Sequence, residues 1–275
     1  MFDFVNTASG TSFTGLKCTK LFHFDKFASL RQELSKHIIE NAKNASRKRV
    51  FSERNNNVYY EQDSTEADQI KTVKCEWHVL QSEAFDIHTI EITMNGHVSK
   101  IIIVNGPDRK DYFETHALIL MRMQNTFFDI GGVIKAWLTE KFEVTISDLV
   151  LEHNFLKSEL DREVPYTAHL KIQVKDLGGL LKIMTLAIHY DDLEAFATHR
   201  GGLYAGITEF LYEATGMKVN TSDQFELVSL LTNQMVLDKR GKLKIIKTGL
   251  PSHDELFWIE SLLIRLTNYA RSGLE

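Results

Sequence analysis

The chain has 275 residues, of which 43% are hydrophobic and 25% charged, and its formal net charge at pH 7 is -5. These values are typical of a globular protein with one large or two small domains, and the net charge argues against a dedicated nucleic-acid binder. Two cysteines, Cys18 and Cys75, exclude a disulfide framework and a four-cysteine zinc site. We expect no secretory signal and no membrane span, because no suitable apolar run occurs, and therefore a reducing compartment.

The first part of the chain predicts strands and a helix, followed by a long loop. Apolar residues alternate within residues 1–24, which indicates one or two strands. Asp25 is a suitable N-cap for a helix that extends to about Ile39. Residues 41–69 are polar and rich in Asn and Ser, with little apolar periodicity. We interpret them as a long flexible loop.

Strands dominate the next part of the chain. Asn95–Gly96 lies between two alternating runs and predicts a two-residue hairpin turn. The apolar run from His116 to Met123 fits a buried strand or a buried helix, and its place between two chain breaks favours a strand. A helix at about 129–141 and a strand at about 144–151 complete an N-terminal α/β unit, residues 1–160. The other strands expected here are 73–80, 87–94 and 97–104.

Residues 161–275 predict a second α/β unit. Alternating strands are expected at 166–175 and 180–189, followed by a helix that begins near Gly201 and ends at Thr215–Gly216. A hairpin with its turn at Asp238–Gly241 comes next. Ser252 and Glu255 form a capping box for a last helix. That helix carries more apolar surface than one sheet needs, which makes it a candidate partner surface, although it could equally close the protein's own core.

The two units repeat one pattern. Gly131–Gly132 and Gly201–Gly202 each open a helix that contains an aromatic–Leu pair and a following Glu, and a strand comes after each helix. We interpret this as two similar strands–helix–strand units and predict an α+β fold with antiparallel sheets. Coincidence is the alternative, because passages from helix to strand are common.

No set of catalytic residues is evident. The segment that begins at Gly201 lacks the GxGxxG spacing, and the chain contains no GxxxxGK[ST], HExxH or GxSxG motif. A metal cluster at 189–192 is possible, but a strand that ends in a polar turn explains these residues without a metal. We therefore predict no enzyme activity, no cofactor and no metal.

One basic cluster lies in the predicted loop. Arg47, Lys48 and Arg49 follow one another, with Lys43 and Arg54 nearby. The loop 46–54 could contact a phosphate backbone through salt-sensitive electrostatics, or act as a nuclear-import signal. A solvated loop without either role is the simpler interpretation.

Several of these segments together are similar to the centromere protein L family of inner-kinetochore subunits. SKIIIVNGPDRK (99–110) and VIKAWLTEKFEVTISDLVLEH (133–153) resemble its first half, and FLYEATGMKV (210–219) with the paired strands that follow resembles its second half. The resemblance covers roughly residues 72–270, and the chain length fits a fungal member. The predicted loop 41–69 has no counterpart in it.

The resemblance implies two units of curved antiparallel sheet, loosely like the saddle of the TATA-binding protein. It also implies a non-enzymatic role in the nucleus, at the centromere and kinetochore, in chromosome segregation. Its C-terminal part would pair with a centromere protein N-type subunit, among other inner-kinetochore proteins, and a homodimer would compete.

Pairing of this kind needs an unpaired edge strand, and we place it in the last hairpin. The hairpin strands are 225–237 and 243–247, with the last helix beside them. The residues expected at the interface are Phe225, Leu227, Leu243, Ile245, Phe257 and Trp258. The alternative function is a nucleic-acid-binding saddle that uses a concave sheet and the basic loop, with centromeric chromatin as a possible contact.

Overall fold

In the computed structural model the chain divides into two compact units, which we describe separately. Unit 1 consists mainly of Leu16–Ser147 and Glu260–Glu275, and unit 2 of Phe2–Gly15 and Asp148–Ile259. The described residues are 10–19, 27–55, 73–81, 86–105, 117–124, 129–162, 164–174, 183–216, 225–246 and 252–272. The predicted N-cap at Asp25 and the breaks at 106–107 and 178–179 lie outside them.

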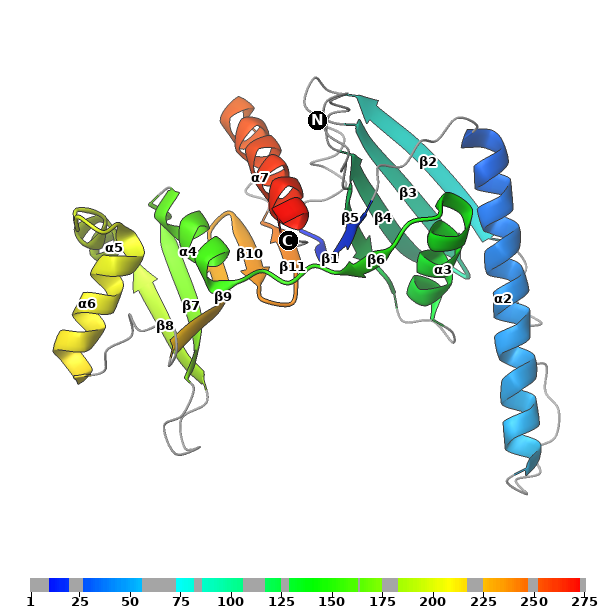
Figure 1. Ribbon diagram of the computed structural model, residues 1–275, viewed down its shortest axis with the longest axis horizontal. Helices are drawn as coiled ribbons and strands as arrows, with labels where there is room; N and C mark the ends of the chain where they lie inside the picture. Colours follow the sequence, from blue (N-terminus) through cyan, green and yellow to red (C-terminus); the bar gives the residue numbers. More distant parts are fainter. Residues whose placement is uncertain are drawn as a thin grey trace. The chain divides into compact units, whose positions relative to one another are not determined.

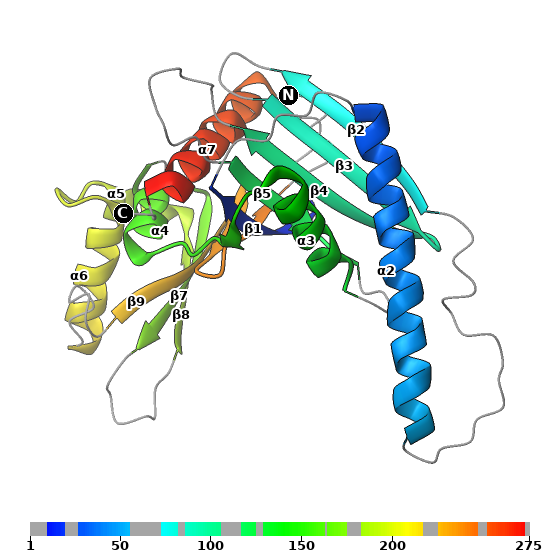
Figure 2. The same cartoon turned by 45° about the vertical axis from the view of Figure 1, so that its right-hand side comes forward.

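Unit 1 is an antiparallel sheet with helices packed against it (Figures 1 and 2). The strand order is β2-β3-β4-β5-β1, and the short β6 pairs with β1. Strand β1 is divided between the units, since its last three residues belong to unit 1. The elements are β1 (Ser12–Cys18), α2 (Phe27–Asn55), β2 (Val73–Gln81), β3 (Asp86–Met94), β4 (His97–Asn105), β5 (Ala117–Arg122), α3 (Ile130–Phe142) and β6 (Ile146–Asp148).

The core of unit 1 lies between this sheet and helices α2 and α3. Leu30, Leu34 and Ile38 form the buried stripe of α2, at the spacing expected for one helix face. Five of the six residues of β5 are buried, which confirms the predicted strand at 116–123. Helix α3 begins where predicted, because Asp129 Oδ1 accepts a hydrogen bond from the Gly132 N–H at 2.9 Å.

The predicted loop 41–69 is wrong for residues 41–55, because α2 continues to Asn55. Among the side chains of α2 that are described, the last buried one is Ala42, and the prediction ended the helix at about Ile39, where the apolar periodicity of the sequence fades. Residues 43–55 nevertheless contain no Gly or Pro, and seven of these thirteen residues are Ala, Lys, Arg or Glu, which favour a helix. Residues 56–69 lie outside the described part of the chain.

Unit 2 contains the remaining strands of the same antiparallel sheet, together with helices (Figure 1). Its strand order is β1-β11-β10-β9-β7-β8, to which β1 contributes its first four residues. Helix α7 begins in unit 2 and continues in unit 1 from Glu260. The elements are α4 (His153–Arg162), β7 (Thr167–Val174), β8 (Ile183–His189), α5 (Tyr190–Ala197), α6 (Leu203–Thr215), β9 (Phe225–Thr232), β10 (Met235–Asp238), β11 (Lys242–Ile245) and α7 (His253–Ser272).

Two helices of unit 2 were not predicted. Helix α4 follows β6 closely and buries Phe155, Leu156 and Leu160 within only ten residues. Because α4 belongs to unit 2, the units divide near Ser147, whereas the predicted division lies at residue 160. The polar turn predicted at 189–192 is the start of α5, where Asp191 and Asp192 favour the positive end of the helix dipole.

The helix predicted from Gly201 is confirmed as α6. Leu203, Ile207 and Leu211 are buried on one face, and Gly216 adopts the left-handed conformation, with a φ of 73°, that ends the helix. Phe210 of the same helix is 52% exposed, and the centroid of its ring lies 5.4 Å from that of Phe196 of α5. A Gly–Gly pair therefore lies at the start of a helix in both units, inside the first turn of α3 and just before α6, while α4 and α5 belong to unit 2 alone.

His88 gives unit 1 a pH-dependent stability. It is buried on β3, accepts a hydrogen bond from Trp77 Nε1 at 3.5 Å, and burial lowers its pKa to about 4. Because the unfolded chain binds the proton near pH 6.5, stability is complete above that pH and falls between pH 6.5 and 4, by at most roughly 3 kcal/mol. Urea unfolding at several pH values measures the loss.

Replacing His88 with Gln should flatten this pH dependence, since Gln also accepts from Trp77 but does not titrate. The matched control is His97→Gln, at an exposed position of the neighbouring strand β4. If both variants keep the full pH dependence of the parent chain, His88 is not the titrating group.

Candidate protein interface

The hairpin predicted to offer a free edge lies inside the sheet of unit 2, so that prediction is wrong. Strand β11 pairs with β10 on one side and with β1 on the other, where Leu243 lies opposite Phe13. Strand β9 likewise lies between β10 and β7. The four hairpin residues expected at the interface are all buried in the core: Phe225, Leu227, Leu243 and Ile245.

A close crossing of three backbone segments fixes β1 against the hairpin. The Gly15 N–H donates to the Gly241 carbonyl at 2.8 Å, and the Leu149 N–H donates to the Gly15 carbonyl at 3.1 Å. A Cβ on Gly15 would lie 2.9 Å from the Leu149 side chain, and a Cβ on Gly241 would collide with the Leu149 carbonyl. Only glycine fits at position 241 without moving the backbone, and a larger residue at position 15 would force the Leu149 side chain to shift.

The two interface residues predicted on the last helix are accessible. Phe257 is 69% exposed and Trp258 is half-buried, both on the part of α7 that belongs to unit 2. The capping box is confirmed, because the Ser252 N–H donates to Glu255 Oε2 at 3.0 Å and the Glu255 N–H donates to Ser252 Oγ at 3.2 Å. A role for these two aromatic residues in binding stays a prediction.

The outer strand of unit 2 is β8. It stands at the end of the strand order and pairs with β7 alone among the described strands. Its side chains alternate between exposed and half-buried, and none is fully buried, although Met184, Leu186 and Ile188 lie opposite buried residues of β7. The residues that cover the apolar face of β7 thus cover β8 only partly, and this part of β8 is accessible to another chain.

Strand β8 lacks the features that usually protect a sheet edge. It contains no Lys, Arg, Asp, Glu or Pro, and Ile183 at its start is 56% exposed. The outer strand of unit 1, β2, differs, because it carries Lys74 and Glu76 and packs against α2. An apolar edge without charges is a site for pairing with another strand.

An exposed aromatic pair marks the other end of β8. Tyr166 and Tyr190 lie just before β7 and just after β8, and their rings contact at 5.4 Å. Tyr166 is 69% exposed, and its N–H donates to Asn233 Oδ1 at 3.1 Å, which anchors its backbone. Rigid exposed tyrosines are typical anchors at protein interfaces.

The basic cluster lies on a helix. Arg47, Lys48 and Arg49 are consecutive residues of α2, and in both views the C-terminal half of this helix extends beyond the strands of unit 1 (Figures 1 and 2). Consecutive helical positions do not share one face, so the three positions are spread around the helix axis. The cluster is therefore part of a projecting basic helix.

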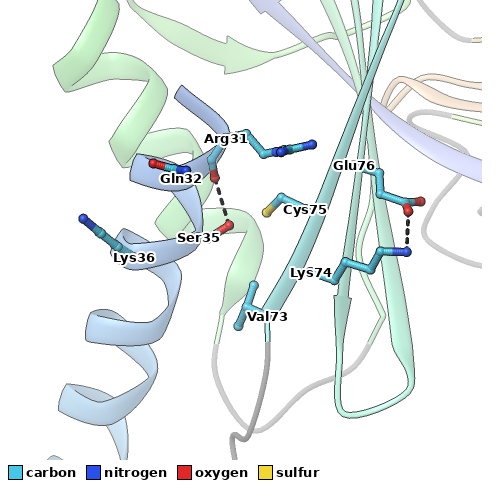
Figure 3. Close-up of a pocket in the computed structure, with 8 residues that line it drawn as sticks. All are labelled: Arg31, Gln32, Ser35, Lys36, Val73, Lys74, Cys75 and Glu76. Carbon is cyan, nitrogen blue, oxygen red and sulfur yellow. Dashed lines mark hydrogen bonds and ion pairs between the residues drawn. The ribbon is translucent and has the colours of Figure 1, made fainter. Parts of the chain in front are cut away.

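A groove lies between α2 and β2 in unit 1 (Figure 3). Its volume is about 520 Å³, and its walls are Arg31, Gln32, Ser35, Lys36, Val73, Lys74, Cys75 and Glu76. Burial raises the pKa of the Cys75 thiol, while Ser35 and Arg31 act in the opposite direction, so the thiol is not activated as a nucleophile. The Ser35 Oγ donates to the Arg31 carbonyl at 2.8 Å, and Lys74 pairs with Glu76.

The buried titratable cluster of unit 2 has a structural role. The Leu227 N–H of β9 donates to His153 Nδ1 at 2.9 Å, and the Tyr204 ring lies edge-on to the His153 ring at 5.3 Å. Burial lowers the pKa of His153 and raises that of Tyr204 to about 12. A neutral imidazole that accepts from the backbone joins α4 to β9, and the Tyr204 N–H donates to Asp161 Oδ1 at 2.7 Å, which joins α6 to α4.

Among the described residues, no three His, Cys, Asp or Glu side chains are grouped so that they could hold a metal ion. None of the described helices combines the length and the apolar character that crossing a membrane requires. No protein-family model matches the sequence, and no curated protein matches it.

Proposed function

We propose that this chain is a non-enzymatic adaptor that binds another protein by adding a strand to β8. The main support is that β8 is an outer strand without charged residues. Its half-buried side chains lie opposite the buried side chains of β7. An added strand gains backbone hydrogen bonds and extends the apolar layer formed by Met184, Leu186 and Ile188. Tyr166 and Tyr190 provide anchors at one end of the contact.

We further propose that the partner is a centromere protein N-type subunit and that the complex acts in the inner kinetochore, in the nucleus. The segments at 99–110, 133–153 and 210–219 support this part of the proposal through their similarity to the centromere protein L family. The resemblance assigns pairing to the C-terminal part of the chain, where β8 lies. We also propose, from the same resemblance, that the strands form a saddle of two related curved sheets.

A second copy of the chain competes for the same edge. Antiparallel pairing of two β8 strands about Leu186 would place Met184 opposite Ile188 and Thr185 opposite Ala187. These pairs contain no like charges, so the strand is compatible with itself. We therefore expect the free chain to self-associate and the partner to replace the second copy.

Co-expression with the centromere protein N-type subunit of the same organism tests the proposal. Size-exclusion chromatography with mass measurement should give a complex of one copy of each chain and, for the chain alone, a homodimer. A chain that stays monomeric alone and elutes apart from the partner would contradict the adaptor function.

Nucleic-acid binding is the second candidate function, and the projecting basic half of α2 favours it. If this helix contacts DNA, changing Arg47, Lys48 and Arg49 together to Ala should weaken duplex binding. The slope of log K against log salt should become shallower by roughly 2 to 3, because three phosphate contacts are lost. Fluorescence anisotropy over a salt series measures both quantities.

The matched control removes three exposed cations from unit 2 by changing Lys171, Arg200 and Arg240 to Ala. Equal losses in both triple variants would indicate a general charge effect and contradict a site on α2. Absence of measurable duplex binding by the parent chain at low salt would exclude this second function.

A further inference from the structure

The groove between α2 and β2 runs along the outer edge of unit 1. Strand β2 stands at the end of the strand order and pairs with β3 along its whole length, from Val73 opposite Met94 to Gln81 opposite Asp86. Four consecutive residues of β2, from Val73 to Glu76, line the groove together with four residues from one side of α2. A segment that occupies the groove would therefore meet the backbone edge of β2.

The charges around the groove are mainly positive. Three cationic residues line the groove, Arg31, Lys36 and Lys74, and the one carboxylate among its lining residues is Glu76, which pairs with Lys74. Arg31 reaches from α2 toward β2, whereas Lys36 points away from the strand (Figure 3). Among the described residues, no carboxylate forms an ion pair with Arg31. The guanidinium therefore presents its charge and five donors at the groove.

The floor of the groove is apolar. Cys75 is buried, Val73 is half-buried, and both belong to the face of the sheet that packs on the core of unit 1. Side chains of an added strand would alternate, so every second one would lie on the α2 side, near Arg31. The others would lie on the side of the Lys74–Glu76 pair, which is already neutralised.

We propose that the α2–β2 groove binds an extended acidic segment of a partner protein, paired with the backbone of β2. Among the described strands β2 has an open edge, which suits an extended ligand, and Arg31 beside it forms no ion pair with a described carboxylate, which suits an acidic one. The charged residues on and beside β2 disfavour an apolar strand and favour an acidic one. Strand β8 differs, because it carries no such charges. This site is separate from the proposed adaptor edge and stands independently of it.

Fluorescence anisotropy with a labelled nine-residue peptide in which Glu alternates with Thr tests this proposal on the full chain. We expect saturable binding that weakens as salt increases. The matched peptide with Gln in place of Glu should bind at least about fivefold more weakly. A copy of the acidic peptide with every second backbone amide N-methylated should not bind, because it cannot pair with β2. Equal binding of all three peptides, or none by the acidic one, would overturn the proposal.

Variants of the chain locate the site. Arg31→Gln should weaken binding of the acidic peptide about fivefold, and Arg31→Glu more strongly. Lys43→Gln is the control, since it removes the same charge from an exposed position of α2 about 18 Å along the helix, beyond the screening length at physiological salt. An equal effect of Lys43→Gln would overturn the assignment to the groove.

Two further variants test whether the peptide binds elsewhere or whether the chain's own residues occupy the groove. Changing Thr185 and Ala187 to Glu on β8 should leave peptide binding unchanged, and loss of binding would move the site to β8. Residues 61–68 of the chain itself contain Glu61, Asp63, Glu66 and Asp68. If the peptide binds only after these four become Gln or Asn, the chain's own acidic segment is the occupant and the partner assignment is overturned.

Discussion

Changing Thr185 and Ala187 to Glu is expected to weaken binding of the partner to this chain about a hundredfold, which corresponds to roughly 3 kcal/mol. Both side chains are exposed on β8, so the two charges should cost little folding stability. Thr185 also lies opposite Lys171 of β7, where a Glu is favourable. Charged side chains on an edge strand oppose sheet extension, which is the mode of binding proposed here. Isothermal titration calorimetry with the purified partner measures the change.

The matched control is a variant with two Glu residues on β7, the strand next to β8 in the sheet. His169 and Gln173 are exposed on β7, on the same face as Thr185 and Ala187, and β7 is paired on both sides. Changing both to Glu should reduce affinity by less than about threefold, because no added strand can reach β7. Equal losses for the two double variants, or no loss for the β8 variant, would exclude strand addition at β8.

Changing Gly241 to Ala is expected to destabilise unit 2 by roughly 3 to 4 kcal/mol. Gly241 has a φ of 72°, which costs any other residue energy, and a Cβ there would collide with the backbone carbonyl of Leu149. The Gly15 N–H donates to the Gly241 carbonyl, so the strain would be transmitted to the pairing of β1 with β11. Urea unfolding, followed by tryptophan fluorescence and by circular dichroism, measures the loss.

Gly96→Ala is the control that separates the cost of backbone strain from the cost of a steric collision. Gly96 has a φ of 81°, but nothing lies within 4 Å of the position a Cβ would occupy. Its replacement should therefore cost only about 1 to 2 kcal/mol, the cost of the left-handed conformation alone. A Gly241 variant no less stable than the Gly96 variant would contradict the close crossing of Gly15, Gly241 and Leu149.

Features set by neighbouring residues could be predicted from the sequence. Asn95 and Gly96 have φ values of 48° and 81°, as the predicted hairpin turn requires, and Met94 lies opposite His97. Asp238 Oδ1 accepts hydrogen bonds from the Arg240 and Lys242 N–H groups, both at 2.9 Å, which confirms the turn that ends at Gly241. Local backbone chemistry alone determines these turns.

The free edge could not be predicted in the same way. Leu243 and Ile245 alternate with polar residues both in an edge strand and in an interior strand whose other face is exposed. What decides between the two is β1, more than 200 residues away in the sequence, where Phe13 pairs with Leu243. The sequence around β8 likewise does not indicate whether another strand pairs with the outer edge of β8.

The helices missed or shortened have a different cause. The prediction required apolar periodicity in the sequence, which fades before residue 43, but α2 continues to Asn55 through residues that include no Gly or Pro and many good helix formers. Helix α5 begins directly at the end of β8, where Asp191 and Asp192 suggested a turn. Acidic residues are common both in turns and in the first turn of a helix, so this pattern alone does not separate the two.

Hydrogen–deuterium exchange tests strand addition at β8, measured on the chain alone at a concentration where it is monomeric and then on its complex with the partner. Amides within Ile183–His189 are expected to exchange quickly in the monomer and to become protected in the complex. Strand β11, already paired with β10 and β1, should be protected in both states. Protection that appears on α7 around Phe257, with β8 unchanged, would contradict it.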